Sequence, residues 1–207
     1  MLIDSSSRRN LELCETLREK QKRGSLLWVL DKTKTAMGAR MMRSFIEQPL
    51  IELEEIEKRQ KAVAELNQNA IAREEIREYL NPVYDLERLI SRISYKTANP
   101  RDLIAFRNSL QMLPAIRYIL NDLSGELLTS IREEIDPLED LYELIDKAIN
   151  DEPPISVRDG GMIKEGFHEE VDRLRSAKTE GKTWLAELET KEREATVIKN
   201  LRIKYNK

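Results

Sequence analysis

Apolar residues recur every three or four positions through most of the first 149 residues, with charged residues between them. This spacing places the apolar side chains on one face of an α-helix. The segment from Thr35 to Pro49 shows the pattern first, because a threonine suited to cap a helix precedes the run and a proline ends it. Its buried stripe is predicted to consist of four large side chains: Met37, Met41, Met42 and Phe45.

The helical pattern returns in four later segments: 51–69, 85–93, 97–120 and 136–149. The third has the clearest start signal, since Asn99 can cap a helix, Pro100 suits its first turn and the Asp102 carboxylate can accept hydrogen bonds from free amides. The buried stripe of that helix is predicted to contain Leu103, Phe106, Leu110 and Leu113. We therefore expect residues 1–152 to form a multi-helix core domain.

The stretch PPISVRDGGMIKEGF, residues 153–167, breaks the helical pattern. Its two prolines and its Asp-Gly-Gly turn signal cannot continue a helix, so we expect a non-helical crossing segment. Residues 168–200 contain no proline and are predicted to form one long arm helix. The arm has a thin apolar seam at approximately heptad spacing, which favours packing along one neighbour: Leu174, Ala177, Gly181, Trp184, Leu188 and Ile198.

The final residues, LRIKYNK at 201–207, alternate apolar and polar side chains and predict a β-strand. No partner strand is evident in the sequence, so we expect the chain to be a piece of a longer protein. The composition agrees with helices elsewhere, because 35% of the 207 residues are charged and only 5% are aromatic. The predicted fold is all-α: a multi-helix core, then a long helical lever arm, ending in a truncated strand.

The charge is almost balanced, with 35 basic and 38 acidic residues, so a phosphate-bearing partner would have to meet a local patch. Residues 126–152 are strongly acidic, whereas the C-terminal end is basic and free of acidic residues. Lys199, Arg202 and Lys204 are therefore candidates for sequence-independent contact with a nucleic-acid backbone. The alternative is a solvated strand face, which is the usual role of a charge cluster.

Other chemistry is poorly represented. Cys14 is the only cysteine and His168 the only histidine, which excludes an internal disulfide and a Cys/His zinc site within one chain. The sequence SAKTEGKT, residues 176–183, ends like a phosphate loop, but Ser176 replaces a required glycine and the segment is predicted to be helical. We predict no catalytic residue, no cofactor-binding residue, no metal ligand and no enzyme activity in this chain.

A Phe-x-Glu sequence begins at Phe45 and could act as a wedge against a mispaired base, but its phenylalanine lies on the predicted core stripe, so we assign it to the core. No apolar run approaches the length needed to span a membrane, and the first residues do not form a secretory signal. A reducing, cytoplasmic location is expected.

Five blocks of the sequence, taken in order, resemble the MutS family of bacterial DNA mismatch-repair proteins: DSSSRRNLELCETLR, GSLLWVLDKTKTAMGARMMRSFIEQPL, VYDLERLISRISYKTANPRDL, PPISVRDGGMIKEGF and ELETKEREATVIKNLRIKYNK. The resemblance implies that 1–152 is the helical core and lever domain, 153–167 the crossing, 168–200 the lever arm, and 201–207 the start of the DNA clamp.

The resemblance implies that the lever and the clamp of this family close around mismatched double-stranded DNA. It also implies that the protein is a homodimer and engages a MutL-type partner. ATP and magnesium bind an ATPase domain that this chain lacks, so the chain would be a scaffold coupling that domain to the clamp and to the mismatch-reading domain. The resemblance also implies a bacterial cytoplasmic protein that joins the nucleoid during repair. Two alternatives are a helical protein-interaction module without a DNA role and a family paralogue serving recombination.

Overall fold

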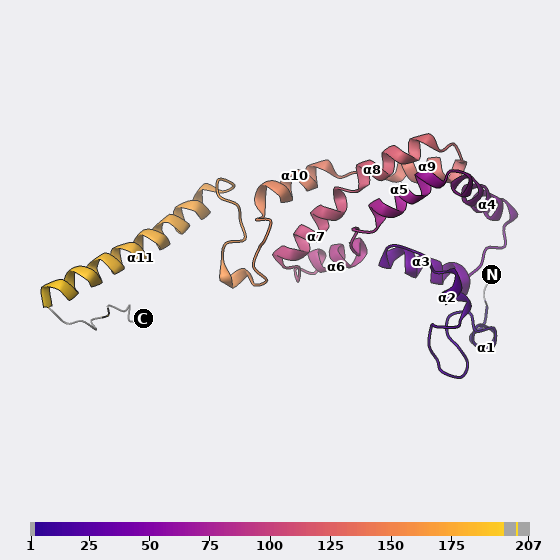
Figure 1. Ribbon diagram of the computed structural model, residues 1–207, viewed down its shortest axis with the longest axis horizontal. Coiled ribbons are helices and arrows are strands. Elements are labelled where there is room, and N and C mark those ends of the chain that lie inside the picture. The colour runs from indigo at the N-terminus through magenta and orange to yellow at the C-terminus, as the bar shows by residue number, and fades with distance from the viewer. Residues whose placement is uncertain (1–2, 197–201, 203–207) are drawn as a thin grey trace. The chain divides into compact units, whose positions relative to one another are not determined.

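The computed structural model describes residues 3–196 and residue 202 of the chain (Figure 1). The chain divides into two compact units, residues 1–162 and residues 163–207. Among the described residues, every secondary-structure element longer than one residue is a helix, which confirms the predicted all-α class. The predicted strand at 201–207 lies outside the described residues except for Arg202.

The first unit contains a series of short and medium helices. In chain order they are α1 (Ser5–Asn10), α2 (Leu26–Leu30), α3 (Ala36–Glu47), α4 (Leu53–Gln68), α5 (Ala70–Leu80), α6 (Leu86–Ser94), α7 (Pro100–Leu110), α8 (Leu113–Ile119), the 3₁₀ helix η1 (Leu120–Asp122), α9 (Glu126–Glu134), α10 (Glu139–Ala148) and the 3₁₀ helix η2 (Val157–Asp159).

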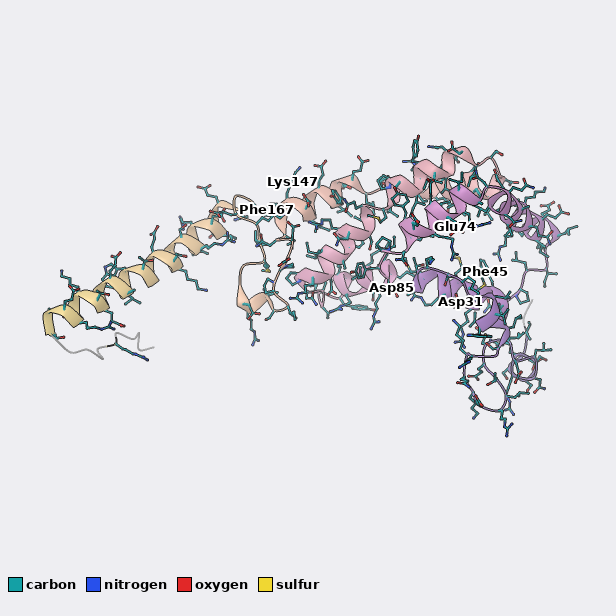
Figure 2. All side chains as sticks on the ribbon, in the orientation of Figure 1. Asp31, Phe45, Glu74, Asp85, Lys147 and Phe167 are labelled. Atoms are coloured by element: carbon teal, nitrogen blue, oxygen red, sulfur yellow. The ribbon has the colours of Figure 1, made fainter. Side chains whose placement is uncertain are left out.

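Helix α3 begins where the sequence predicted, because the Gly38 amide donates to Thr35 Oγ1 at 3.0 Å. The predicted burial of its apolar stripe is wrong. Met41 is 59% exposed and Phe45 is 39% exposed, while Met37 and Met42 are half-buried. Helix α3 packs mainly against the short α2, which is too small to cover the stripe. The Phe45 side chain, labelled on α3 in Figure 2, instead stacks under a guanidinium, with Arg59 Cζ 3.8 Å from the ring centroid.

One hydrophobic core is formed where α4 and α5 pack against α8, η1 and α9. Its buried residues are Ala62, Ala72, Ile116, Ile119, Leu120, Leu123 and Leu128. A carboxylate closes one end, since Glu65 accepts hydrogen bonds from the backbone amides of Ser124 at 2.6 Å and Gly125 at 2.8 Å. These amides precede α9, so a side chain of α4 satisfies donors that the helix itself cannot.

A second core is formed by α6, α7 and α10, around the buried side chains of Leu89, Phe106 and Leu110. The predicted start of α7 is confirmed as a reciprocal capping box. The Asp102 amide donates to Asn99 Oδ1 at 3.0 Å, and the Asn99 amide donates to Asp102 Oδ2 at 2.8 Å. The same three helices line an apolar groove of about 540 Å³ whose walls include exposed Ile90, Leu141 and Leu144.

The second unit is dominated by α11 (Glu169–Thr196), a continuous helix of 28 residues. At 1.5 Å per residue its length is about 42 Å. This confirms a long arm helix, although its predicted end near residue 200 lies outside the described residues. The phosphate-loop-like sequence lies within the helix, where Thr183 Oγ1 donates to the Thr179 carbonyl at 3.1 Å. Its interpretation as a helix interior is therefore correct.

Candidate functional site

The first candidate site is the set of contacts that fixes the start of the connecting segment within the first unit. Arg107 on α7 is central, because its Nη1 lies 2.8 Å from Asp146 Oδ1 and 2.7 Å from Asp151 Oδ1. Asp146 is on α10 and Asp151 follows that helix. The Arg107 side chain is only 12% exposed. One guanidinium thus joins α7, α10 and the beginning of the connection.

Two further contacts shape the connecting segment. Arg101 Nε donates to the Pro153 carbonyl at 3.1 Å, and the Asn150 amide donates to the Met162 carbonyl at 2.9 Å. The second bond brings together the two ends of the loop between residues 150 and 162. Gly160 and Gly161 both have a φ of +74°, in the left-handed region that favours glycine. Among residues 153–167 the structure has one helical element, the single turn of η2.

In the second unit, the first turns of α11 are fastened to the residues that precede them. Asp172 Oδ2 accepts from the Gly166 amide at 2.7 Å, and Arg175 Nη2 donates to the Ile163 carbonyl at 2.8 Å. Arg175 Nη1 and Asp172 Oδ1 are 3.1 Å apart. The entering chain is therefore held by two side chains of the helix itself, so a rotation of α11 would carry residues 163–166 with it.

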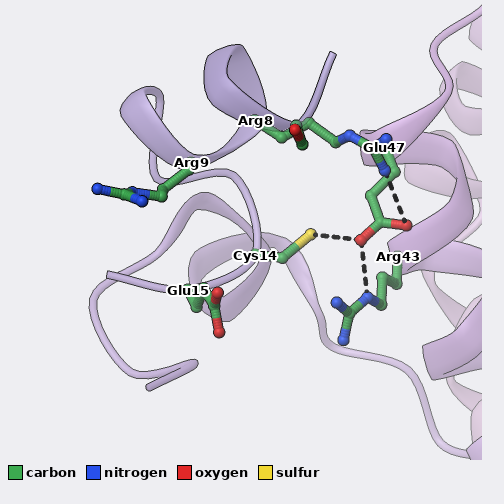
Figure 3. Close-up of a pocket in the computed structure, with 7 residues that line it drawn as sticks. Arg8, Arg9, Cys14, Glu15, Arg43 and Glu47 are labelled. Carbon is green, nitrogen blue, oxygen red and sulfur yellow. Dashed lines mark hydrogen bonds and ion pairs between the residues drawn. The ribbon is translucent and has the colours of Figure 1, made fainter. Parts of the chain in front are cut away.

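A second candidate site is a pocket of about 250 Å³ between α1, the following loop and α3 (Figure 3). Glu47 lies at its centre, with Arg43 Nε 2.9 Å from one carboxylate oxygen and Arg8 Nη1 3.9 Å from the other. The Cys14 thiol donates to Glu47 at 3.4 Å. Figure 3 shows the Arg9 side chain directed away from this group.

The electrostatics of this pocket keep the thiol protonated. Burial raises the pKa of Cys14, and its hydrogen bond to the Glu47 carboxylate raises the pKa further. Burial opposes ionisation of Glu47, but the hydrogen bonds from Arg43 and Cys14 hold the pKa of that carboxyl below its usual value. A nucleophilic cysteine requires the opposite shift. The pocket is therefore arranged as a structural ion-pair cluster.

The candidate nucleic-acid contacts are only partly visible. Arg202 is exposed, while Lys199 and Lys204 lie outside the described residues, so their grouping stays a prediction. His168 is exposed just before α11. Within residues 3–196 and 202, no group of three or more His, Cys, Asp or Glu residues is placed to hold a metal ion. No helix in the same part of the chain is long and apolar enough to cross a membrane.

Sequence reasoning missed the anchoring residues Arg107, Asp151 and Arg175. The spacing of Asp172 and Arg175, three positions apart on a helix, did carry a signal for that pair. No local sequence signal pointed to Arg107, because its two carboxylate partners lie 39 and 44 residues away in the sequence.

Comparison with known sequences decides the family. A sequence profile described as MutS domain III matches residues 6–207. The chain belongs to the MutS domain III family. The MutS resemblance carried by the five sequence blocks is therefore confirmed.

The curated relatives are MutS proteins. Over its whole length the chain is 70% identical to the DNA mismatch repair protein MutS of Lachnoclostridium phytofermentans, and it covers 22% of that protein. It is 54% identical to the DNA mismatch repair proteins MutS of Acetivibrio thermocellus and of Caldanaerobacter subterraneus subsp. tengcongensis, of each of which it covers 24%. The chain thus spans less than a quarter of the length of these MutS relatives.

Proposed function

We propose that this chain is the core and lever part of a DNA mismatch-repair protein and couples an ATPase domain to a DNA clamp and a mismatch-reading domain. The support from sequence is the match to MutS domain III together with relatives that are named DNA mismatch repair proteins. Within this proposal, residues 1–152 are the core, 153–167 the crossing, 168–200 the arm and 201–207 the start of the clamp.

The mechanical role is supported mainly by the uninterrupted helix α11. Its first turns are hydrogen-bonded, through Asp172 and Arg175, to the residues that precede the helix. A continuous hydrogen-bonded helix transmits rotation and displacement along its axis. Coupling between distant sites requires an element with two arrangements that both sites bias. We assign this role to the arm, with the contacts of Arg107 holding the body side of the connection.

The remaining parts of the proposal concern the longer protein. ATP and magnesium are bound by a domain beyond this chain, so ATP hydrolysis resides there. The protein acts as a homodimer on mismatched double-stranded DNA, engages a MutL-type partner, and works in the bacterial cytoplasm at the nucleoid. Lys199, Arg202 and Lys204 are assigned to backbone contact near the clamp.

The decisive test breaks the arm in the full-length protein. Proline substitutions at Leu174 and Leu188 interrupt the α11 hydrogen-bond ladder at two points. We expect nucleotide-dependent release of mismatched DNA to be lost while ATP binding is retained. Unchanged release would overturn the lever role, and proline-free variants Leu174→Ala and Leu188→Ala control for loss of the side chains.

A separate test addresses DNA contact by this chain. Fluorescence anisotropy with matched and mismatched duplexes should show weak binding that is equal for both duplexes and falls with salt. Charge reversal at Arg202 and Lys204 should reduce it further. Tight binding with a preference for the mismatch would mean that recognition does not reside in other domains, and insensitivity to charge reversal would favour an interaction module without a DNA role.

A further inference from the structure

The connecting segment begins with a closed loop, residues 150–162, which we call the strap. Its two ends are joined, because the Asn150 amide donates to the Met162 carbonyl at 2.9 Å. The turn at Gly160 and Gly161 stands in open space, with no atom within 4 Å of the position that a Cβ would take at either glycine. A compact surface segment whose ends lie together is an Ω-loop, and such loops are frequently functional. The strap is therefore built to move as one unit.

Two arginines of α7 contact the base of the strap. Arg101 Nε donates to the carbonyl of Pro153, a buried residue, and Arg107 Nη1 donates to Asp151 Oδ1. Beside these contacts lies a pocket of about 350 Å³, with walls from both sides: Asp151, Glu152 and Pro153 of the strap, and Tyr84, Arg101, Ile104, Ala105 and Asn108. The strap thus meets α7 through polar contacts and one buried proline next to an open space.

The two carboxylates that pair with Arg107 are not equivalent. Both accept from Nη1, while Nε and Nη2 of Arg107 lie 3.3 and 3.2 Å from Oδ1 of Asn108 on the same helix. The side chain of Asp146 is 45% exposed and that of Asp151 is 66% exposed. The guanidinium itself is only 12% exposed, so its charge requires a carboxylate partner. Since Asp146 on α10 supplies one, movement of Asp151 would leave no buried charge unpaired.

We propose that Arg107 is a releasable clasp for the strap. In the closed position its guanidinium holds both Asp146 and Asp151. In the open position it holds Asp146 alone, and the strap lifts from α7 and uncovers the pocket. Burial of Pro153 favours the closed position, and hydration of the Asp151 carboxylate favours the open one. This inference concerns the first unit alone, and it goes beyond the lever role without resting on it.

Thiol labelling of Ile104→Cys tests this release in the full-length protein, in a background without other reactive cysteines. Ile104 is half-buried and lines the pocket, so a maleimide too bulky for a space of about 350 Å³ should react only when the strap is lifted. Asp151→Asn weakens the contact with Arg107 and should raise the labelling rate about tenfold or more. Glu152→Gln removes the neighbouring charge of the strap, serves as the matched control and should leave the rate unchanged.

Asp146→Asn distinguishes a clasp from a fixed cluster of charges. Arg107 keeps Asp151 in this variant, so the labelling rate should stay near that of the parent, while the midpoint of denaturant unfolding falls because the contact between α7 and α10 is weakened. Equal acceleration in Asp146→Asn and Asp151→Asn would overturn the clasp. An unchanged rate in Asp151→Asn would also overturn it, as would an acceleration that follows a fall in the unfolding midpoint, since that would report unfolding of the core.

Discussion

The two units of the chain are stabilised in different ways. In residues 1–162, α-helices of 5 to 16 residues bury apolar side chains in two cores, and the start of α9 is satisfied by Glu65, which is distant in sequence. In α11 the described side chains are at most half-buried, and the ion pairs Arg175–Asp172 and Arg193–Glu189 each join residues three or four positions apart. The stability of residues 1–162, the body, therefore depends on tertiary packing, and the stability of α11, the arm, depends on local helical order.

The same substitution in both units should separate these two sources of stability most strongly. Leu110 is 2% exposed in the second core, whereas Leu174 is 63% exposed on the arm. Leu110→Ala should lower the free energy of unfolding by about 3 kcal/mol, because it leaves a cavity. Leu174→Ala should change it by no more than about 0.5 kcal/mol. Denaturant titration at low protein concentration measures both, and equal effects would contradict the comparison.

A smaller effect is expected from the anchor of the connection. Arg107→Gln removes the charge shared by Asp146 and Asp151, and it should lower the free energy of unfolding of the body by about 1–2 kcal/mol. Arg175→Gln should act locally, increasing hydrogen exchange of the Gly166 amide and the first turn of α11. Hydrogen exchange read by mass spectrometry distinguishes the two, and a global loss in Arg175→Gln would show that the arm is not locally stabilised.

The smallest effect is a pH dependence confined to the body. Hydrogen bonds from Lys22 and Thr33 lower the pKa of Asp31 to about 2. Since the folded pKa lies below the unfolded value of 3.8, this stabilisation is complete above about pH 4 and is lost as the pH falls toward 2. We expect Asp31→Asn to be less stable at neutral pH by about 1 kcal/mol, with the difference vanishing near pH 2. If the difference in stability persisted near pH 2, its cause would not be the ionisation of Asp31.

Local signals explain what the sequence could predict. The helix start at Asn99 and Asp102 could be predicted from the sequence because both residues lie within one helical turn. The long arm helix could be predicted because it contains no proline. Burial of the α3 stripe was predicted wrongly, because periodicity identifies an apolar face but not the element that covers it.

Long-range contacts explain what the sequence could not show. Glu65 accepts hydrogen bonds from amides at the start of α9, about 60 residues away in the sequence. Arg107 pairs with Asp146 on α10 and with Asp151 in the loop that follows. Such pairings depend on the folded path of the chain, and charged residues in amphipathic helices are usually solvent-facing. The family resemblance supplied the functional assignment that neither periodicity nor charge could provide.

The lever role requires α11 to move as one stiff element. Spin labels at residues 170 and 194, in a background without other reactive cysteines, should give a single narrow distance of about 36 Å, set by the helical rise. In the full-length protein the distance should be the same with and without ATP and mismatched DNA. A broad distribution, or a distance that shortens in one nucleotide state, would show that α11 bends and would contradict its role as a lever.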